Sequence, residues 1–307
     1  MSSTAAEQQM QDNASRPHIR QKSKFGAFDL INYALLVALA IVMLYPLWHV
    51  IIASLVENAE YYATSVFLYP QSPTLDNYEY LFVETPTLNY VLNTAFITVV
   101  GTFFSLLLQS MMAYGLSRKF PGVITIVFLV TATMFLYPGL IPNYINFKNL
   151  GLINTRMLLI LIPMMQPFYL LIFRSNFLNF PEELIDAARV DGYNHFAIFF
   201  TIVIPLSKPI LAAIGLFVAV NYWNMLLPSV FFVSNQEKKM IQDYLLQLLS
   251  YSQLSVSSAA IAVEEQQTTT ETLRMAAIVV GVLPILMVYP FLQRYFVRGA
   301  LLGAIKG

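Results

Sequence analysis

Long apolar runs alternate with shorter polar stretches along most of the chain, and the lengths of these runs suit a lipid bilayer. A helix needs about 20 predominantly apolar residues to cross the hydrocarbon core. Six runs approach or exceed this length, at residues 31–55, 90–112, 123–141, 157–173, 209–227 and 275–292. The pattern predicts an all-α polytopic membrane protein with six transmembrane helices. The fourth should be kinked, because Pro163 and Pro167 flank Gln166 within it.

The polar interval between the fourth and fifth runs has the pattern of a folded helix. Pro181 suits a first helical turn, and Glu182, Glu183 and Asp186 place negative charge near the positive end of the helix dipole. Residues spaced at i, i+4, i+7 and i+8 should form one apolar face, comprising Phe180, Leu184, Ala187 and Ala188. The interval therefore predicts an amphipathic helix.

A turn and a second helix should follow. Asp191 and Gly192 interrupt the pattern, since glycine adopts positive φ without strain. Asn194 can then cap a second apolar helix that runs to Pro205.

The distribution of basic residues predicts the orientation of the six runs. Lys and Arg are concentrated in the cytoplasmic loops of membrane proteins. Twelve of the 17 basic residues lie on the N-terminal side of the six runs and five on the other side. Both termini and the loop at 175–207 are therefore predicted to be cytoplasmic, and the loop at 229–272 external. The expected domains are a cytoplasmic tail at 1–28, a transmembrane domain at 29–293 and a cytoplasmic tail at 294–307.

Composition agrees with a membrane location and excludes several other classes. Of the 307 residues, 57% are apolar and 11% charged, and the mean hydropathy is +0.63, which does not suit an ordinary soluble domain. The formal net charge is zero and no long basic run occurs, so no nucleic-acid partner is expected. The chain has no cysteine, which excludes disulfides, zinc–thiolate sites and thiol nucleophiles.

The polar interval resembles the EAA loop of ABC importer permeases. A Glu-Ala-Ala triplet in that family is followed after fixed spacings by Gly and by Ile-x-Leu-Pro, and the matching positions here are Asp186, Ala187, Ala188, Gly192, Ile202, Ile204 and Pro205. Asp186 replaces the usual Glu, and Ile204 replaces the usual Leu. The resemblance implies a coupling helix that docks on a cytoplasmic ATPase through Glu183, Asp186, Ala187, Ala188, Asp191, Gly192 and Pro205. An ordinary amphipathic cytoplasmic loop is the alternative.

The external loop carries a second amphipathic pattern, at residues 237–250. Ile241, Leu245, Leu248 and Leu249 fall on one helical face, whereas Gln242, Asp243 and Gln247 lie elsewhere. This helix could rest on the membrane surface or on the outer mouth of a transporter. A comparable loop lies in the family where a substrate-binding protein docks, and a surface helix without a partner is the alternative.

Several catalytic and energy-coupling motifs are missing from the sequence. No G-x-x-x-x-G-K-[ST] phosphate loop occurs, so ATP must be bound by another subunit if transport is active. His18, His49 and His195 are scattered without metal-ligand spacing, so no metal site and no catalytic residue is expected. The apolar runs lack ionisable residues at their centres and show no inverted repeat, which disfavours a secondary transporter.

Polar and aromatic residues inside the fourth and fifth runs are candidates for a substrate pathway. They are Gln166, Tyr169, Asn221, Tyr222, Trp223 and Asn224. Aromatic faces can stack on the C–H surfaces of sugars, while amides hydrogen-bond their hydroxyl groups. Helix–helix hydrogen bonding and interfacial anchoring of Trp and Tyr are the alternatives.

The end of the chain narrows the resemblance. Residues 269–276, 295–299 and 303–307 look like the carbohydrate-importer branch, of the LplC/YtcP type. Membership implies a type I ABC importer permease fold in a bacterial cytoplasmic membrane. It also implies a second homologous permease, two P-loop ATPase subunits that hold ATP and Mg, an extracytoplasmic solute-binding protein and a carbohydrate substrate, with membrane lipid around the spans. This chain itself should carry no cofactor. A permease for a non-sugar solute and a membrane scaffold that binds another cytoplasmic partner are the alternatives.

Overall fold

The computed structural model describes residues 26–63, 68–136, 138–257 and 271–304, and within these ranges the chain is helical and has no strand. Most of the predicted N-terminal tail, part of the external loop and residues 305–307 lie outside the described residues. The chain divides into two compact units, residues 1–48 and 49–307, which are described separately.

The first unit contains most of helix α2 (Ala27–Ala53), whose last residues belong to the second unit. The remaining elements follow in chain order: α3 (Asn58–Ala63), α4 (Asp76–Glu79), η1 (Tyr80–Glu84), α5 (Thr87–Leu116), α6 (Val123–Ala132), α7 (Leu140–Asn149), α8 (Arg156–Leu161), α9 (Pro167–Leu178), α10 (Glu182–Val190), α11 (His195–Ile198), η2 (Phe199–Val203), α12 (Ile204–Leu206), α13 (Lys208–Trp223), α14 (Leu227–Phe232), η3 (Gln236–Lys238), α15 (Ile241–Ser257) and α16 (Glu271–Ala304).

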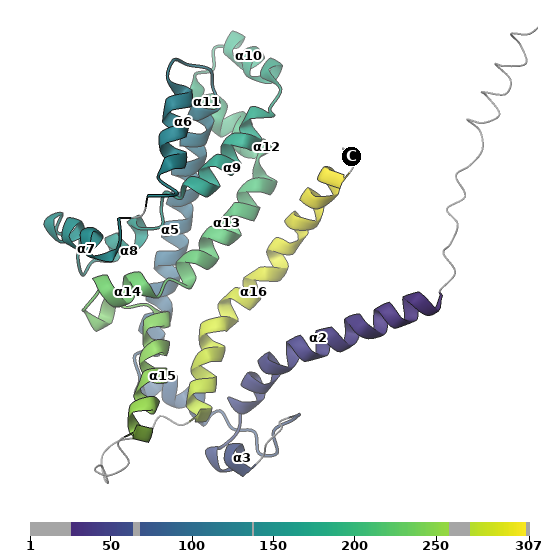
Figure 1. Cartoon of the computed structure of the whole chain (residues 1–307), viewed down its shortest axis with the longest axis vertical. Helices are drawn as coiled ribbons and strands as arrows, with labels where there is room; N and C mark the ends of the chain where they lie inside the picture. Colours follow the sequence, from purple (N-terminus) through teal and green to yellow (C-terminus); the bar gives the residue numbers. More distant parts are fainter. Residues whose placement is uncertain (1–25, 64–67, 137, 258–270, 305–307) are drawn as a thin grey trace, which may run out of the picture. The chain divides into compact units, whose positions relative to one another are not determined.

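The core of the second unit surrounds α5, which packs against α9 and α13 (Figure 1). Tyr222 on α13 is fully buried, and its hydroxyl donates a 2.7 Å hydrogen bond to the carbonyl of Ile160. Its ring lies against Gly101 of α5, where a Cβ atom would overlap the ring. The glycine therefore allows α5 and α13 to approach closely at this point.

Helix α16 packs against α13 and α15. The indole Nε1 of Trp223 donates a 2.8 Å hydrogen bond to the carbonyl of Gly281 on α16, and both groups are buried. Near its start, α16 contributes Leu273 and Ala277 to a small apolar cluster with Leu81. The α5–α13–α16 packing places α10 beyond the C-terminal end of α5, and α14 and α15 near its N-terminal end (Figure 1).

Three helices in the described ranges are long and apolar enough to cross a membrane: residues 28–53, 87–116 and 271–288. The pair His195–Leu206 and Lys208–Trp223 makes a fourth if it is counted as one span, with a bend of 83°. The predicted number of six spans is therefore not confirmed. The sixth run was also expected to end at 292, but α16 continues to Ala304, into the predicted tail.

Two of the predicted runs are broken into short helices. In the third, α6 ends at Ala132 and α7 begins only at Leu140, after Pro138 and Gly139 (φ 88°). Pro138 has no backbone N–H for a hydrogen bond inside a helix, which disfavours a continuous helix through this point. In the fourth, the expected kink is a complete interruption between α8 and α9, and Pro167 occupies the first turn of α9.

Candidate functional site

The interval at 180–205 folds as the predicted helix, turn and helix. Helix α10 begins after Pro181 with Glu182 and Glu183 in its first turn. It ends with a Schellman motif. The N–H of Gly192 donates to the carbonyl of Arg189 and the N–H of Tyr193 donates to the carbonyl of Ala188, and both hydrogen bonds are 3.0 Å long. Gly192 has φ 86°, a conformation that other residues adopt only with strain. The turn thus depends on this glycine.

The second helix starts as predicted. The side-chain oxygen of Asn194 accepts a 2.8 Å hydrogen bond from the N–H of Ala197, which caps α11. α11 continues through the π-helical turn η2 into α12, where Pro205 occupies the first turn. Single π-turns inside helices are rare and occur often at functional sites.

The apolar face of α10 differs from the prediction. Ile185 and Ala188 are buried in the core around α5, whereas Leu184 is 46% exposed and Ala187 is also exposed. The inward side of the helix is therefore rotated by one residue from the predicted stripe. Of the predicted residues, Ala188 is buried, and Phe180, just before the helix, packs against the same core. Val190, at the end of α10, is 88% exposed. The helix presents apolar side chains to solvent that nothing in the described chain covers.

The charged residues of α10 form exposed ion pairs. Asp186 Oδ1 lies 3.3 Å from Arg189 Nη1, and Glu182 Oε1 lies 3.3 Å from Lys119 Nζ. Pairs this exposed contribute little to stability, so all four side chains remain accessible to a partner. The predicted coupling residues Glu183, Asp191 and Pro205 are exposed as well.

His195 has a place in the structure that the sequence did not reveal. Its Nδ1 lies 3.4 Å from the hydroxyl oxygen of Tyr114 on α5, and its Nε2 lies 3.5 Å from Arg189 Nη2. The histidine thus links the start of α11 to both α5 and α10. No spacing rule could have found this contact, because Tyr114 is 81 residues away in sequence.

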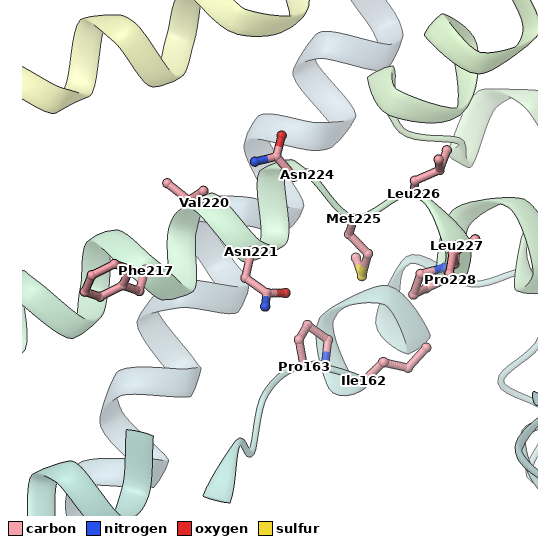
Figure 2. A pocket seen from close by; sticks show the side chains of 10 residues that line it. All are labelled: Ile162, Pro163, Phe217, Val220, Asn221, Asn224, Met225, Leu226, Leu227 and Pro228. Carbon is pink, nitrogen blue, oxygen red and sulfur yellow. The ribbon is translucent and has the colours of Figure 1, made fainter. Parts of the chain in front are cut away.

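A cavity of about 520 Å³ lies between α8, α13 and the segment that leads into α14 (Figure 2). Its lining is mainly apolar, with Asn221 and Asn224 as the polar side chains. Figure 2 shows the amide of Asn221 directed toward Pro163, whereas the amide of Asn224 points the other way. Consistent with this direction, Asn224 Oδ1 accepts a 3.3 Å hydrogen bond from Gln242 Nε2 on α15.

The other predicted pathway residues do not line this cavity. Tyr222 and Trp223 are buried and form the helix–helix hydrogen bonds described above, which is the alternative that the sequence left open. Gln166 is the residue that precedes α9, and Tyr169 is partly buried against the core around α5. The predicted set is therefore split between a cavity wall and helix packing.

Helix α15, which the sequence predicted to be external, packs on its own chain. Ile241 is fully buried, and Leu245 and Leu248 pack against the apolar cluster at the start of α16, whereas Leu249 is 43% exposed. The main-chain N–H of Ile241 donates a 2.9 Å hydrogen bond to Thr94 Oγ1 on α5. Because these contacts hold α15 against α5 and α16, its predicted apolar face is directed into the protein and does not rest on a membrane surface.

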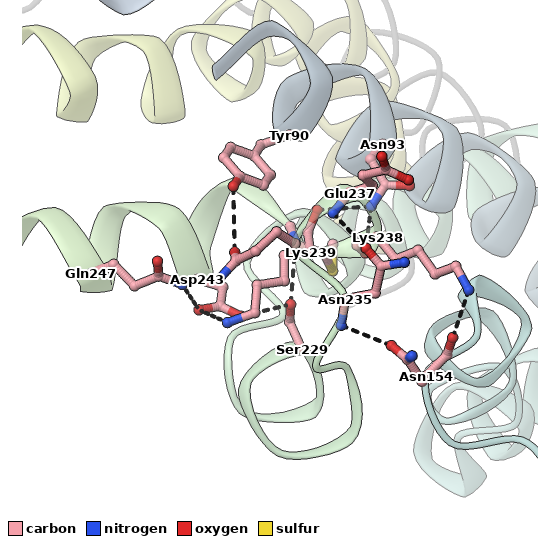
Figure 3. A network of polar contacts seen from close by, with 12 residues as sticks. Tyr90, Asn93, Asn154, Ser229, Asn235, Glu237, Lys238, Lys239, Asp243 and Gln247 are labelled. Carbon is pink, nitrogen blue, oxygen red and sulfur yellow. Dashed lines mark hydrogen bonds and ion pairs between the residues drawn. The ribbon is translucent and has the colours of Figure 1, made fainter. Parts of the chain in front are cut away.

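Asp243 was expected to lie on the polar side of α15, but it is only 2% exposed. Its carboxylate accepts hydrogen bonds from Gln247 Nε2 (2.9 Å) and Ser229 Oγ (3.3 Å), and it lies 3.2 Å from Lys239 Nζ (Figure 3). A buried charge is tolerated only with such partners. The network fixes the start of α15 to the end of α14.

A second part of this network attaches the residues just before α15 to α5. Asn93 Nδ2 donates to the carbonyls of Lys238 and Lys239 over 2.6 and 2.8 Å, and Lys238 Nζ donates to the carbonyl of Asn154 over 3.0 Å (Figure 3). Sequence reasoning missed Asn93 because it stands within an apolar run and its partners are 145 and 146 residues away.

In the part of the chain that the structure describes, no group of three or more His, Asp or Glu side chains could hold a metal ion. The candidate site thus consists of the exposed helix α10 and the amide-bearing cavity beside α13.

Comparisons with known proteins identify a matching family and related permeases. A family model described as the inner membrane component of binding-protein-dependent transport systems matches residues 101–301. The polygalacturonan/rhamnogalacturonan transport system permease protein YtcP of Bacillus subtilis (strain 168) is 38% identical over 281 residues, or 91% of this chain and 98% of that protein. Protein LplC of the same strain is 35% identical over 293 residues, or 94% of this chain and 99% of that protein.

A solved structure has the same fold. One chain of a bacterial ABC transporter involved in the import of the acidic polysaccharide alginate matches with a TM-score of 0.79 and 28% identity. The match covers 89% of this chain and 100% of that chain.

Proposed function

The chain belongs to the family of binding-protein-dependent transport system inner membrane components, and on this premise we propose that it is a permease subunit of an ATP-driven ABC importer. The importer moves an oligosaccharide or another carbohydrate into the cytoplasm. Its location is the cytoplasmic membrane of a bacterium, which it crosses several times.

The observation that carries this proposal is the exposed face of α10 next to the turn at Gly192. Leu184, Ala187 and Val190 are apolar and exposed, while Ile185 and Ala188 fix the helix to the core around α5. A helix with one face held by the core and another apolar face open is suited to dock on a partner and to pass its movement to the spans. The partner in our proposal is a pair of P-loop ATPase subunits that hold ATP and Mg.

The accessible charges of this segment define how the contact is made. Asp186 and Glu183 offer carboxylates to the ATPase, Asp191 marks the end of the helix, and Pro205 begins the last turn of the second helix. Asp186 takes the place of the Glu of related loops, and its pairing with Arg189 keeps the shorter side chain along the helix. The Arg189 side chain then contributes to the same docking surface.

The full importer has further parts in this proposal. A second homologous permease completes the transmembrane pathway, and an extracytoplasmic solute-binding protein delivers the substrate to the side of α14 and α15. We propose six spans with both termini cytoplasmic, in which α6 and the pair α8 and α9 contribute shorter spans. The excess of basic residues near the termini and near 175–207 supports this orientation.

A carbohydrate is the proposed substrate because the relatives are named for carbohydrate transport and because the chemistry of the first cavity suits a sugar. YtcP is named for polygalacturonan and rhamnogalacturonan transport, and the structural neighbour for import of alginate. Asn221 supplies an amide for hydroxyl groups and Phe217 an apolar face in the same wall. Gln166 and Tyr169 are proposed to contact substrate elsewhere along the pathway.

Purification and reconstitution test the proposal. The tagged chain should recover a P-loop ATPase and a second permease from its host membrane. ATP hydrolysis by the reconstituted complex should rise with a binding protein loaded from a panel of neutral oligosaccharides, uronate oligosaccharides and non-sugar solutes. If only a non-sugar solute stimulated ATP hydrolysis, the substrate would belong to another chemical class. Recovery of a different cytoplasmic partner without an ATPase would support a membrane scaffold instead.

The cavity has its own test within this experiment. Asn221→Ala should lower substrate-stimulated uptake, whereas Asn221→Gln should retain part of it because the amide is kept. Uptake unchanged in Asn221→Ala, in a complex that is folded and hydrolyses ATP normally, would remove this residue from the pathway.

A further inference from the structure

A second cavity, of about 450 Å³, lies at the C-terminal end of α5, between the turn at 117–122 and the start of α11. Three basic residues, Arg118, Lys119 and Arg189, share its lining with His195 and Gly115. The remaining wall is apolar or aromatic and consists of Met111, Tyr114, Phe120, Phe196 and Phe199. Among the described residues that line it there is no carboxylate, so the cavity combines positive charge with an apolar wall.

Arg118 is held in place by its neighbours while part of it remains unused. Its Nε and Nη2 donate to Ser117 Oγ over 3.1 and 3.0 Å, and Nη2 also donates to the carbonyl of Phe177 over 3.3 Å. The guanidinium carbon lies 5.0 Å from the centre of the Tyr114 ring. These contacts occupy Nε and Nη2, so the two N–H groups of Nη1 remain for a ligand.

The other two cations are paired with carboxylates that lie outside the cavity lining. Lys119 contacts Glu182 with the two side chains 91% and 70% exposed, and Arg189 contacts Asp186 with the two side chains 48% and 66% exposed. Exposed pairs of this kind are weak, so a phosphate that enters the cavity can attract both cations. The five charged groups together carry one net positive charge.

We propose that this cavity binds the phosphate headgroup of an anionic phospholipid. Free inorganic phosphate would use only the cations, whereas Phe120 and Phe196, 39% and 66% exposed, offer an apolar surface that the acyl chains of a lipid can cover. The cavity also lies at the end of α5, one of the helices long and apolar enough to span the membrane, which is the level where headgroups occur.

A lipid bound here connects two parts of the chain that otherwise meet through few polar contacts. Arg118 and Lys119 follow α5, while Arg189 ends α10 and Phe196 lies in α11. This inference goes beyond the proposed transport function, since binding does not require that α10 dock on an ATPase. Only the leaflet depends on that proposal, because a cytoplasmic α10 places the lipid in the inner leaflet.

Two variants test the charge and the space of the cavity separately. Arg118→Gln with Arg189→Gln removes two cations and keeps two polar side chains. Gly115→Leu keeps all charges and fills the cavity, since nothing lies within 4 Å of an added Cβ at this helical position. Lys208→Gln is the matched control, because it removes an exposed cation outside the cavity.

The measurement is the amount of lipid that stays bound to the detergent-purified importer complex, by native mass spectrometry with added phosphatidylglycerol or phosphatidylcholine. Wild type and Lys208→Gln should retain phosphatidylglycerol in preference to phosphatidylcholine. The double Gln variant should retain at least about tenfold less, as expected for the loss of charge-assisted hydrogen bonds. Gly115→Leu should also retain less, because the added side chain occupies the space of the lipid. Thermal unfolding of each complex confirms that it is folded.

Several results would overturn the proposal. Equal retention of the two lipids by wild type would remove the charge argument, and displacement of the bound lipid by millimolar inorganic phosphate would assign the cavity to a free anion. Normal lipid retention by the double Gln variant, together with loss of the ATPase from the complex, would show that the basic residues contact the ATPase instead.

Discussion

Replacing Gly192 tests whether the turn after α10 couples ATP hydrolysis to transport. A Cβ at Gly192 would meet nothing within 4 Å, so substitution acts through the backbone alone. At φ 86° an L-residue other than Gly or Asn costs about 1–2 kcal/mol, which lowers the equilibrium constant for the intact turn by a factor of about 5–30. The two Schellman hydrogen bonds that end α10 are lost when the turn opens.

A graded series uses this conformational preference. Gly192→Asn should be tolerated best because Asn adopts positive φ more readily than other residues, Gly192→Ala should be impaired, and Gly192→Val most of all. Gly151→Ala is the matched control, because Gly151 follows α7 in the same kind of turn, has φ 68°, and its added Cβ also meets nothing within 4 Å. The same backbone strain there should lower stability without lowering the ratio of uptake to ATP hydrolysis.

The assay is the amount of sugar taken up per ATP hydrolysed by the importer complex in proteoliposomes, measured with saturating loaded binding protein. The ratio should fall in the order Gly, Asn, Ala, Val at position 192, while basal hydrolysis by the ATPase subunits persists. If Gly192→Val retains the wild-type ratio in a folded complex, or if Gly151→Ala lowers the ratio as much as Gly192→Ala does, the argument from backbone strain in this turn is refuted.

Three further changes test the packing around the site, each by thermal unfolding of the purified complex unless stated. Gly101→Ala should destabilise by about 1–3 kcal/mol because the added methyl group overlaps Tyr222, and the cost should fall in a Tyr222→Leu background. Asp243→Ala should cost about 3–5 kcal/mol because it leaves the Lys239 ammonium buried without its partner, so a change below 1 kcal/mol would contradict the network in Figure 3. Asn194→Ala should cost about 1 kcal/mol through the lost cap, seen as faster hydrogen exchange in the first turn of α11, and unchanged exchange would contradict the cap.

Local chemistry in the sequence was sufficient to predict the turn between α10 and α11. Gly192 and Asn194 have the conformation and the cap that their residue types favour, because both effects arise within a few residues of the chain. The face that α10 buries was predicted incorrectly. Leu184 and Ile185 are equally apolar, and only the position of α5 and α9 selects Ile185 as the buried one.

The membrane spans show a similar division. The second and sixth runs form single long helices, which agrees with their unbroken apolar pattern. The third and fourth runs are as apolar, but Pro138 and Pro163 lie in the breaks between their helices. Proline predicts a kink or a break equally well from sequence, and the tertiary contacts that replace the lost backbone hydrogen bonds decide between them.

The split among the pathway candidates on α13 follows from the geometry of a helix. Successive residues of an α-helix are about 100° apart, so four consecutive residues cannot all face one cavity. Asn221 and Asn224 both border the first cavity, although only the amide of Asn221 is directed into it, while Tyr222 and Trp223 point toward α5 and α16. The 3.6-residue period of the helix therefore already separates the two amide residues of the segment at 221–224 from its two aromatic residues. The period does not predict which of the two pairs faces the protein interior. That choice depends on Gly101, which lies against the Tyr222 ring, and on Gly281, whose carbonyl accepts the hydrogen bond from Trp223, and both lie more than 50 residues away in sequence.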